Sequence, residues 1–119
     1  LIKKWFSEVN ADGNNLVGVQ NIQYDLSTAT TALDFANDEL QEISIVADTT
    51  FTCTGYVAGK SKSIKITTDA TLRTLTFPAA WRFVGPKPID QAASKIGMLT
   101  ITSYTAAEAG IVAAYAVEQ

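Results

Sequence analysis

The strongest constraint on the fold of this chain is an alternation of apolar residues with threonine and other polar residues. Leu75 and Phe77, for example, alternate with threonines, and similar runs recur between residues 31 and 117. Successive side chains of a β-strand point to opposite faces of its sheet, and β-branched threonine suits the exposed face. The alternation therefore predicts strands that bury one face and expose the other.

Turn residues divide this pattern into seven or eight short strands. The strands are expected at 33–35, 43–45, 51–53, 64–66, 75–77, 81–83, 96–104 and 111–117. A single helical turn that ends at Gly110 is expected before the last strand. This number and spacing of strands is typical of a β-sandwich or jelly-roll-like domain, so the predicted fold class is all-β.

The segment from residue 31 to residue 45 allows two interpretations. Leu33 and Phe35 alternate with smaller or polar residues, as do Ile43 and Ile45, and a turn at 37–38 lies between them. This arrangement favours a hairpin. A helix over 31–42 is the alternative, because Ala, Leu and Glu favour helices.

The length of 119 residues fits one domain. Residues 1–24 are polar and broken by turn residues, so they are predicted to be an extended N-terminal arm or stem segment. Trp5 and Phe6 in this arm need a neighbouring surface to cover them. Residues 25–119 are predicted to form the β-sandwich domain.

The last predicted strand, 111–117, is apolar on both faces, which is typical of a strand covered on both sides. In so small a domain a subunit interface is a reasonable cover. We therefore predict a homo-oligomer whose contacts include the arm and one face of this strand. The predicted interface residues are Trp5, Phe6, Ile111, Ala113, Tyr115 and Val117.

Charge and composition exclude several classes of partner. The net charge is −3, whereas nucleic-acid binding usually needs a basic face. Lys60, Lys62 and Lys65 are interpreted as a solvated strand and turn. No uninterrupted apolar run approaches the ~20 residues of a membrane helix, so membrane insertion is not expected.

The residues that catalysis most often needs are scarce. Cys53 is the single cysteine, so an internal disulfide is excluded, and the absence of histidine excludes Ser-His-Asp and Cys-His mechanisms and the usual zinc sites. Cys53 is interpreted as a small buried hydrophobe.

Gly55 to Ser61 resembles a phosphate loop but has the wrong spacing, so a hairpin connection is preferred. Carboxylates that could form a glycosidase pair stand mostly at predicted turns: Asp34, Asp38, Glu39, Asp48, Asp69 and Asp90. The prediction is a non-enzyme with no cofactor and no metal.

Three aromatic residues are candidates for stacking on sugars: Tyr56, Trp81 and Tyr104. The alternative for Trp81 is that it seals the rim of the domain together with Phe83. A monomeric carbohydrate-binding module therefore stands as the second functional hypothesis.

Several segments together resemble a known group of proteins. Residues 75–85 read LTFPAAWRFVG, residues 43–51 read ISIVADTTF, and residues 95–103 read KIGMLTITS before AAYA at 113–116. These segments, with the Pro86-Lys87-Pro88 loop, resemble the C-terminal β-sandwich domains of fibre, appendage or head-decoration proteins of tailed bacteriophages. Many relatives close with a Gly-Gly-rich turn and a Trp-Tyr pair, whereas here the turn is Ala106 to Gly110 and the closing strand carries Tyr115 alone.

The resemblance implies a place and a role. It implies a structural domain of the virion, assembled in the bacterial cytoplasm, that is usually a homotrimer and contacts other virion proteins. It also implies a part in particle architecture or in host attachment, which includes binding to a host-surface glycan.

Overall fold

The computed structural model describes residues 24–25, 31–36 and 39–119 of the chain. The described residues form strands and one short 3-10 helix, which confirms the all-β, sandwich-like class. Of the predicted arm at 1–24, residues 1–23 lie outside them, whereas Tyr24 belongs to a strand of the front sheet. The elements are β1 (Tyr24–Asp25), β2 (Ala32–Asp34), β3 (Leu40–Ile45), β4 (Thr49–Thr50), β5 (Thr52–Thr54), β6 (Lys60–Thr68), β7 (Arg73–Thr76), β8 (Arg82–Phe83), β9 (Asp90–Gln91), β10 (Ile96–Ser103), η1 (Glu108–Gly110) and β11 (Ile111–Val117).

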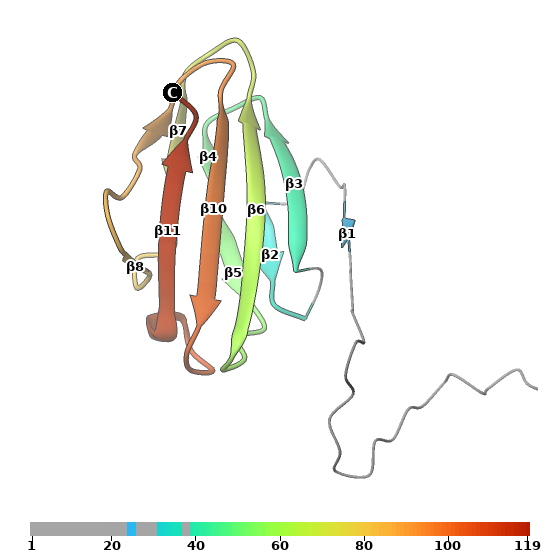
Figure 1. Cartoon of the computed structure of the whole chain (residues 1–119), viewed down its shortest axis with the longest axis vertical. Coiled ribbons are helices and arrows are strands. Elements are labelled where there is room, and N and C mark those ends of the chain that lie inside the picture. Colours follow the sequence, from blue (N-terminus) through green and yellow to red (C-terminus); the bar gives the residue numbers. More distant parts are fainter. Residues whose placement is uncertain (1–23, 26–30, 37–38) are drawn as a thin grey trace, which may run out of the picture.

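Two layers make up the sandwich (Figure 1). The front layer is a six-stranded sheet in the order β1-β3-β6-β10-β11-β8. The back layer contains β2 paired with β5, and β7 between β4 and β9. The short strands β4 and β5 are separated only by Phe51, so one stretch of chain pairs first with β7 and then with β2.

The residues that alternate in the sequence point alternately to the inside and to the outside of this sandwich. In β6, Ile64 and Ile66 are completely buried, whereas Ser63 and Lys65, which alternate with them, are partly exposed. The same period holds in β10, where Leu99 is buried and Met98 is exposed. Burial of the inward set drives the two layers together, because each buried aliphatic side chain contributes about 1.5–3 kcal/mol.

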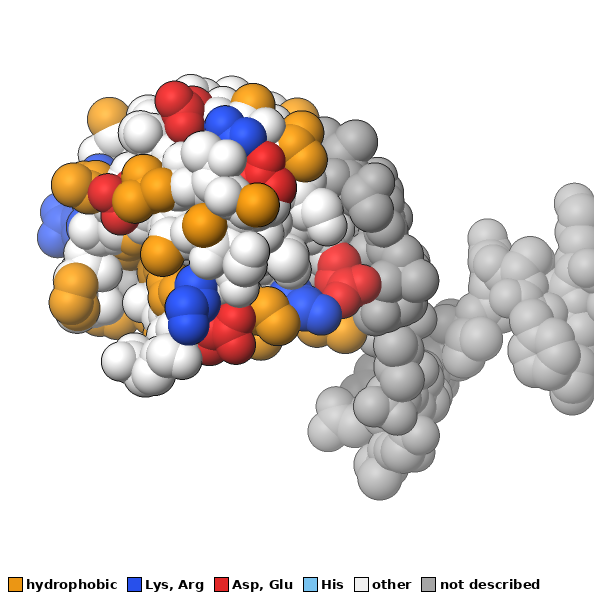
Figure 2. Space-filling model, turned by 90° about the horizontal axis from the view of Figure 1, so that it is seen from above, with side chains coloured by type: hydrophobic (Ala, Val, Ile, Leu, Met, Phe, Trp, Pro, Cys, Tyr) orange, Lys and Arg blue, Asp and Glu red, His pale blue; other side chains and the backbone are white. Residues whose placement is uncertain are grey.

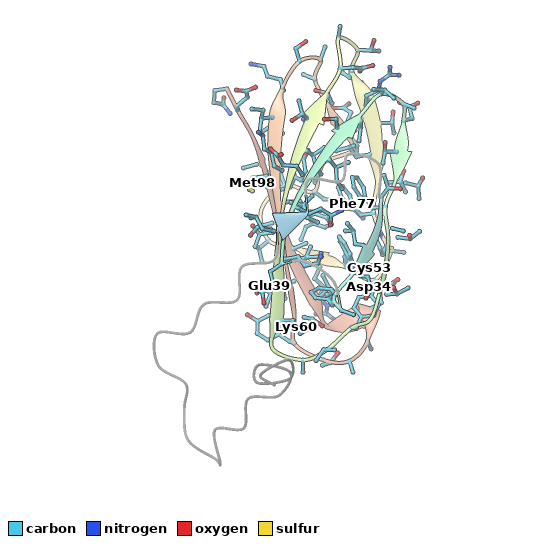
Figure 3. All side chains as sticks on the ribbon, turned by 90° about the vertical axis from the view of Figure 1, so that its right-hand side faces the viewer. Asp34, Glu39, Cys53, Lys60, Phe77 and Met98 are labelled. Atoms are coloured by element: carbon cyan, nitrogen blue, oxygen red, sulfur yellow. The ribbon has the colours of Figure 1, made fainter. Side chains whose placement is uncertain are left out.

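Aromatic rings fill one region of the core around Phe77, which lies between the two layers (Figure 3). The Phe77 ring stacks on Phe51 at a centroid distance of 5.1 Å and on Trp81 at 6.0 Å. It meets Phe83 and Tyr115 at tilted angles, at 5.2 and 6.2 Å. Such pairs add about 0.5–1.5 kcal/mol beyond their buried area. Segments from both layers are therefore held to one ring.

The predicted hairpin between residues 33–35 and 43–45 is wrong, and so is the alternative helix. β2 lies in the back layer and pairs in parallel with β5, whereas β3 lies in the front layer and pairs in parallel with β6. Leu33, Phe35, Ile43 and Ile45 are all buried, because the two strands face each other across the core. The alternation identified the buried faces correctly, but it contains no information on which strands share hydrogen bonds.

The connection at 55–59 is also not a hairpin. It links β5 in the back layer to β6 in the front layer. The final hairpin is formed instead by β10 and β11, whose residues 97–103 pair antiparallel with 111–117. The predicted helical turn before β11 is confirmed as η1.

Candidate functional site

One end of the sandwich, here called the loop end, is formed by the connections at 55–59, 77–81 and 104–110. The Gly59 amide donates to the Ser103 carbonyl at 2.7 Å, and the Ala80 amide donates to Glu108 Oε2 at 3.1 Å. Lys60, Asp34 and Cys53 lie toward this end (Figure 3). The fold therefore brings three separate connections together.

Two buried polar atoms at the loop end have no hydrogen-bond partner among the described residues. They are the Tyr56 hydroxyl and Trp81 Nε1. The two groups lie near each other, and burial raises the pKa of Tyr56 to about 12 although proximity to Trp81 acts in the opposite direction. We interpret the contact between the Tyr56 hydroxyl and Trp81 Nε1 as close but too poorly aligned to be a hydrogen bond. Most buried polar atoms are hydrogen-bonded, so these two mark a polar spot under the surface.

Cys53 lies beside this spot and is partly buried against the core. Burial raises the pKa of its thiol, and this outweighs the lowering by the Tyr56 hydroxyl and by the charge of Lys62. The thiolate is the reactive form, so the environment disfavours reaction. The geometry agrees with the expected role of Cys53 as a small apolar residue.

Lys62 corrects the prediction of a solvated strand for this lysine. Its side chain is buried between the layers, and its ammonium group donates to the Asp34 carbonyl at 3.2 Å. Lys60 makes the matching bond to the Phe35 carbonyl, also at 3.2 Å. The two lysines share the inward parity of β6, and near the loop end a long side chain reaches backbone carbonyls of the opposite layer. Lys65, of the other parity, is on the outer face as expected.

Three of the carboxylates considered for glycoside hydrolysis, Asp34, Asp48 and Asp69, bind backbone amides or an arginine, and Asp38 lies outside the described residues. Asp34 Oδ1 accepts from the Ala36 amide at 2.9 Å, and Asp48 Oδ1 accepts from the Thr74 amide at 3.0 Å. Asp69 forms an ion pair with Arg73, which lowers the pKa of the carboxyl group. In the described part of the chain no three metal-ligating side chains gather in one place.

The three aromatic candidates for sugar stacking occupy different environments. Trp81 is 4% exposed and packed on Phe77, so its ring face is not accessible and its place in a stacking site is wrong. Its alternative role, sealing the domain together with Phe83, fits the ring contact of 6.5 Å between them. Tyr56 is partly buried. Tyr104, which is 66% exposed, is the one of the three that presents a ring to solvent.

The predicted interface residues of the last strand face the core. Ile111 and Ala113 are buried within the chain and offer no surface to a partner. Tyr115 and Val117 are of the same parity and partly buried, and the Tyr115 hydroxyl donates to Gln91. Trp5 and Phe6 lie outside the described residues. The prediction chose the wrong parity of β11, because both parities are apolar and the larger residues went inward.

The opposite parity of β11 belongs to a surface that the prediction missed. We define the outer face as the solvent side of β3, β6, β10 and β11, onto which Figure 1 looks. Its residues are Leu40, Glu42, Ser44, Ser61, Ser63, Lys65, Thr67, Ile96, Met98, Thr100, Thr102, Val112, Ala114 and Ala116. Small and apolar side chains dominate, and among these residues the charged ones are Glu42 and Lys65. The alternation itself could have identified this set, since it fixes both faces of each strand.

The outer face carries a shallow hollow of about 190 Å³. Leu40 and Met98, which are 43% and 47% exposed, stand at its rim, with the Glu42–Lys65 ion pair at 2.9 Å beside them. The end of the molecule seen in Figure 2 differs, because there acidic, basic and hydrophobic side chains are interspersed. The outer face is therefore the more uniform and less charged surface.

Comparison with known proteins returned no match among family models, curated proteins or solved structures. None of the helical segments in the described residues has the length and apolarity to span a membrane.

Proposed function

We propose that this chain is a non-catalytic structural domain that associates with copies of itself in a bacteriophage virion, as part of a fibre, an appendage or a head decoration. The observation that carries self-association is the outer face. Large apolar side chains stand there beside small ones, Met98 opposite Ala116 and Leu40 opposite Ser63. Exposed apolar patches of this kind commonly mark protein contacts.

The virion setting comes from the resemblance of residues 43–51, 75–85 and 95–116 to virion proteins. In that setting the domain contributes mechanically, by burying surface between chains and by contact with other virion proteins. The stoichiometry expected from the resemblance is three.

Native mass spectrometry or light scattering of the full chain tests self-association. We expect an oligomer at about 100 micromolar protein. A folded monomer under those conditions would contradict the proposal.

A carbohydrate-binding module is the second candidate, and exposed Tyr104 favours it. Its exposed aromatic ring can stack on a sugar. A glycan array probed with wild type and with Tyr104→Ala separates the candidates. Saturable binding that Tyr104→Ala abolishes without loss of folding supports the module, and a blank array with wild type argues against it.

A further inference from the structure

Three rows of side chains cross the outer face from β3 to β6. In the register of this parallel pair, Leu40 is opposite Ser63, Glu42 is opposite Lys65, and Ser44 is opposite Thr67. Each row thus places a large apolar residue beside a small one, an acid beside a base, or a hydroxyl beside a hydroxyl. Each row is therefore complementary to the same row of a second copy when the two residues stand in the opposite order.

The middle row carries the charge of this surface. Lys65 Nζ lies 2.9 Å from Glu42 Oε1, and the two side chains keep 41% and 36% of their exposure. Both groups can therefore meet a partner while still in contact with each other. The hollow described above opens next to this pair.

A two-fold axis parallel to the strands and between β3 and β6 makes these rows meet. It lays Leu40 of one copy over Ser63 of the other, and Glu42 over Lys65 in both directions. Two other placements of the axis are unfavourable. An axis above β6 sets Lys65 against Lys65, and an axis across the strands at the middle row sets like charges against each other.

We infer that a second copy of this chain docks face to face on the β3–β6 part of the outer face about this two-fold axis. The inference rests on the proposed function and names the surface that it uses. Two sheets packed face to face align their strands within about 30°, which keeps the middle row in register. The contact is isologous, since one patch meets itself. It yields a dimer, or joins two trimers into a hexamer.

The size of the contact determines the protein concentration at which self-association should be measured. The axis between β3 and β6 lays β3 of one copy on β6 of the other, and these two strands, about 4.8 Å apart and six residues long at about 3.3 Å per residue, cover roughly 200 Å² in projection. A contact of this size is smaller than a stable specific interface and is therefore weak. We expect self-association through it at about 100 micromolar protein, which is the concentration for these measurements.

Charge reversal with mixing tests the inference. Glu42→Lys places two lysines on the patch, and Lys65→Glu places two glutamates on it. Each variant alone should associate at least about tenfold more weakly than wild type, because like charges then meet. A one-to-one mixture should form a heteromer that neither variant forms alone. The ion pair within one chain cannot produce this result, because it is absent from both variants.

Native mass spectrometry of the full chain supplies the readout, and circular dichroism confirms that each variant is folded. Asp90→Lys, an exposed charge reversal on β9 in the other layer, is the matched control and should associate like wild type. Ser63→Arg fills the position under Leu40 and should weaken association without reversing a charge.

The outcomes separate the inference from the proposed function. A heteromer in the mixture supports both. An oligomer that neither charge reversal weakens, or a lone trimer, overturns the two-fold contact and leaves self-association intact. A wild-type monomer at about 100 micromolar overturns the proposed function itself.

Discussion

A single side chain, Gln91, ties the back layer to the front sheet. Its Nε2 donates to the Ile66 carbonyl at 3.0 Å and to the Lys95 carbonyl at 2.8 Å, and its Oε1 accepts from the Tyr115 hydroxyl. Gln91 is almost fully buried. A buried amide that makes three hydrogen bonds both stabilises and positions the strands it joins.

We expect Gln91→Leu to lower the free energy of unfolding by about 2–4 kcal/mol, because it removes three buried hydrogen bonds and leaves the Tyr115 hydroxyl without its acceptor. Urea denaturation followed by tryptophan fluorescence measures this. Tyr115→Phe removes one of the three bonds and should cost about 1 kcal/mol. Equal losses in the two variants would contradict this account.

The Tyr56 hydroxyl makes the stability of the protein depend on pH. Burial raises the pKa of Tyr56 to about 12, from an ordinary value of 10. The folded state thus holds the Tyr56 proton more tightly than the unfolded state does. The stability that this group contributes is therefore complete below pH 10 and is lost as the pH rises towards 12. Tyr56→Phe should reduce the decline of stability over that interval. Identical pH profiles for the variant and wild type would refute the prediction.

Burial of single residues was largely predictable from the sequence, and its exceptions have physical causes. Strand parity assigned Leu75, Leu99 and Ile64 to the core correctly. It failed for Lys62, because the sequence does not show that a backbone carbonyl in the interior can accept a hydrogen bond from this ammonium group. It also failed for Ile111, because a strand that is apolar on both sides does not reveal which side is inward.

At the scale of elements, the chain passes between the layers at nearly every connection. β2 lies in the back, β3 in the front, β4 and β5 in the back, and β6 in the front again. Strands one circuit apart then run in the same direction, as β3 and β6 do. Alternation and turns predicted the positions of these strands, and β11 matches its predicted bounds. The circuit itself was missed, because turn residues mark where the chain bends and not which layer it enters.

Close packing between β10 and β11 gives an element-scale prediction at Gly97. A Cβ there would overlap the Tyr115 hydroxyl and lie 2.7 Å from Tyr115 Cζ. Gly97→Ala should therefore cost about 1–3 kcal/mol in urea denaturation. Thr100→Ala, an outer-face change on the same strand, should change stability by at most about 0.5 kcal/mol.

The mechanism at Gly97 is tested by coupling. In a Tyr115→Leu background the obstructing ring is absent, so Gly97→Ala should cost less than in wild type. Additive effects of the two substitutions would show that the overlap with Tyr115 is not the cause.

The whole molecule is held together by pairings between distant segments. β6 pairs with β10, and Thr67 lies opposite Ile96 in that ladder. Closing such loops costs entropy before the contacts form, which makes all-β domains slow to fold. We expect refolding in milliseconds to seconds by stopped-flow fluorescence of the tryptophans. Refolding within microseconds would contradict this topology.

The position of β10 in the front sheet has a consequence for biosynthesis. β10 lies between β6 and β11, yet it follows all but one of the other strands along the chain. A nascent polypeptide emerging from the ribosome thus carries β6 with an open hydrogen-bonding edge until the C-terminal hairpin arrives to cover it. Newly made chains at high local density can pair through that edge with one another, so the interval before β10 is translated is when misassembly threatens this domain most.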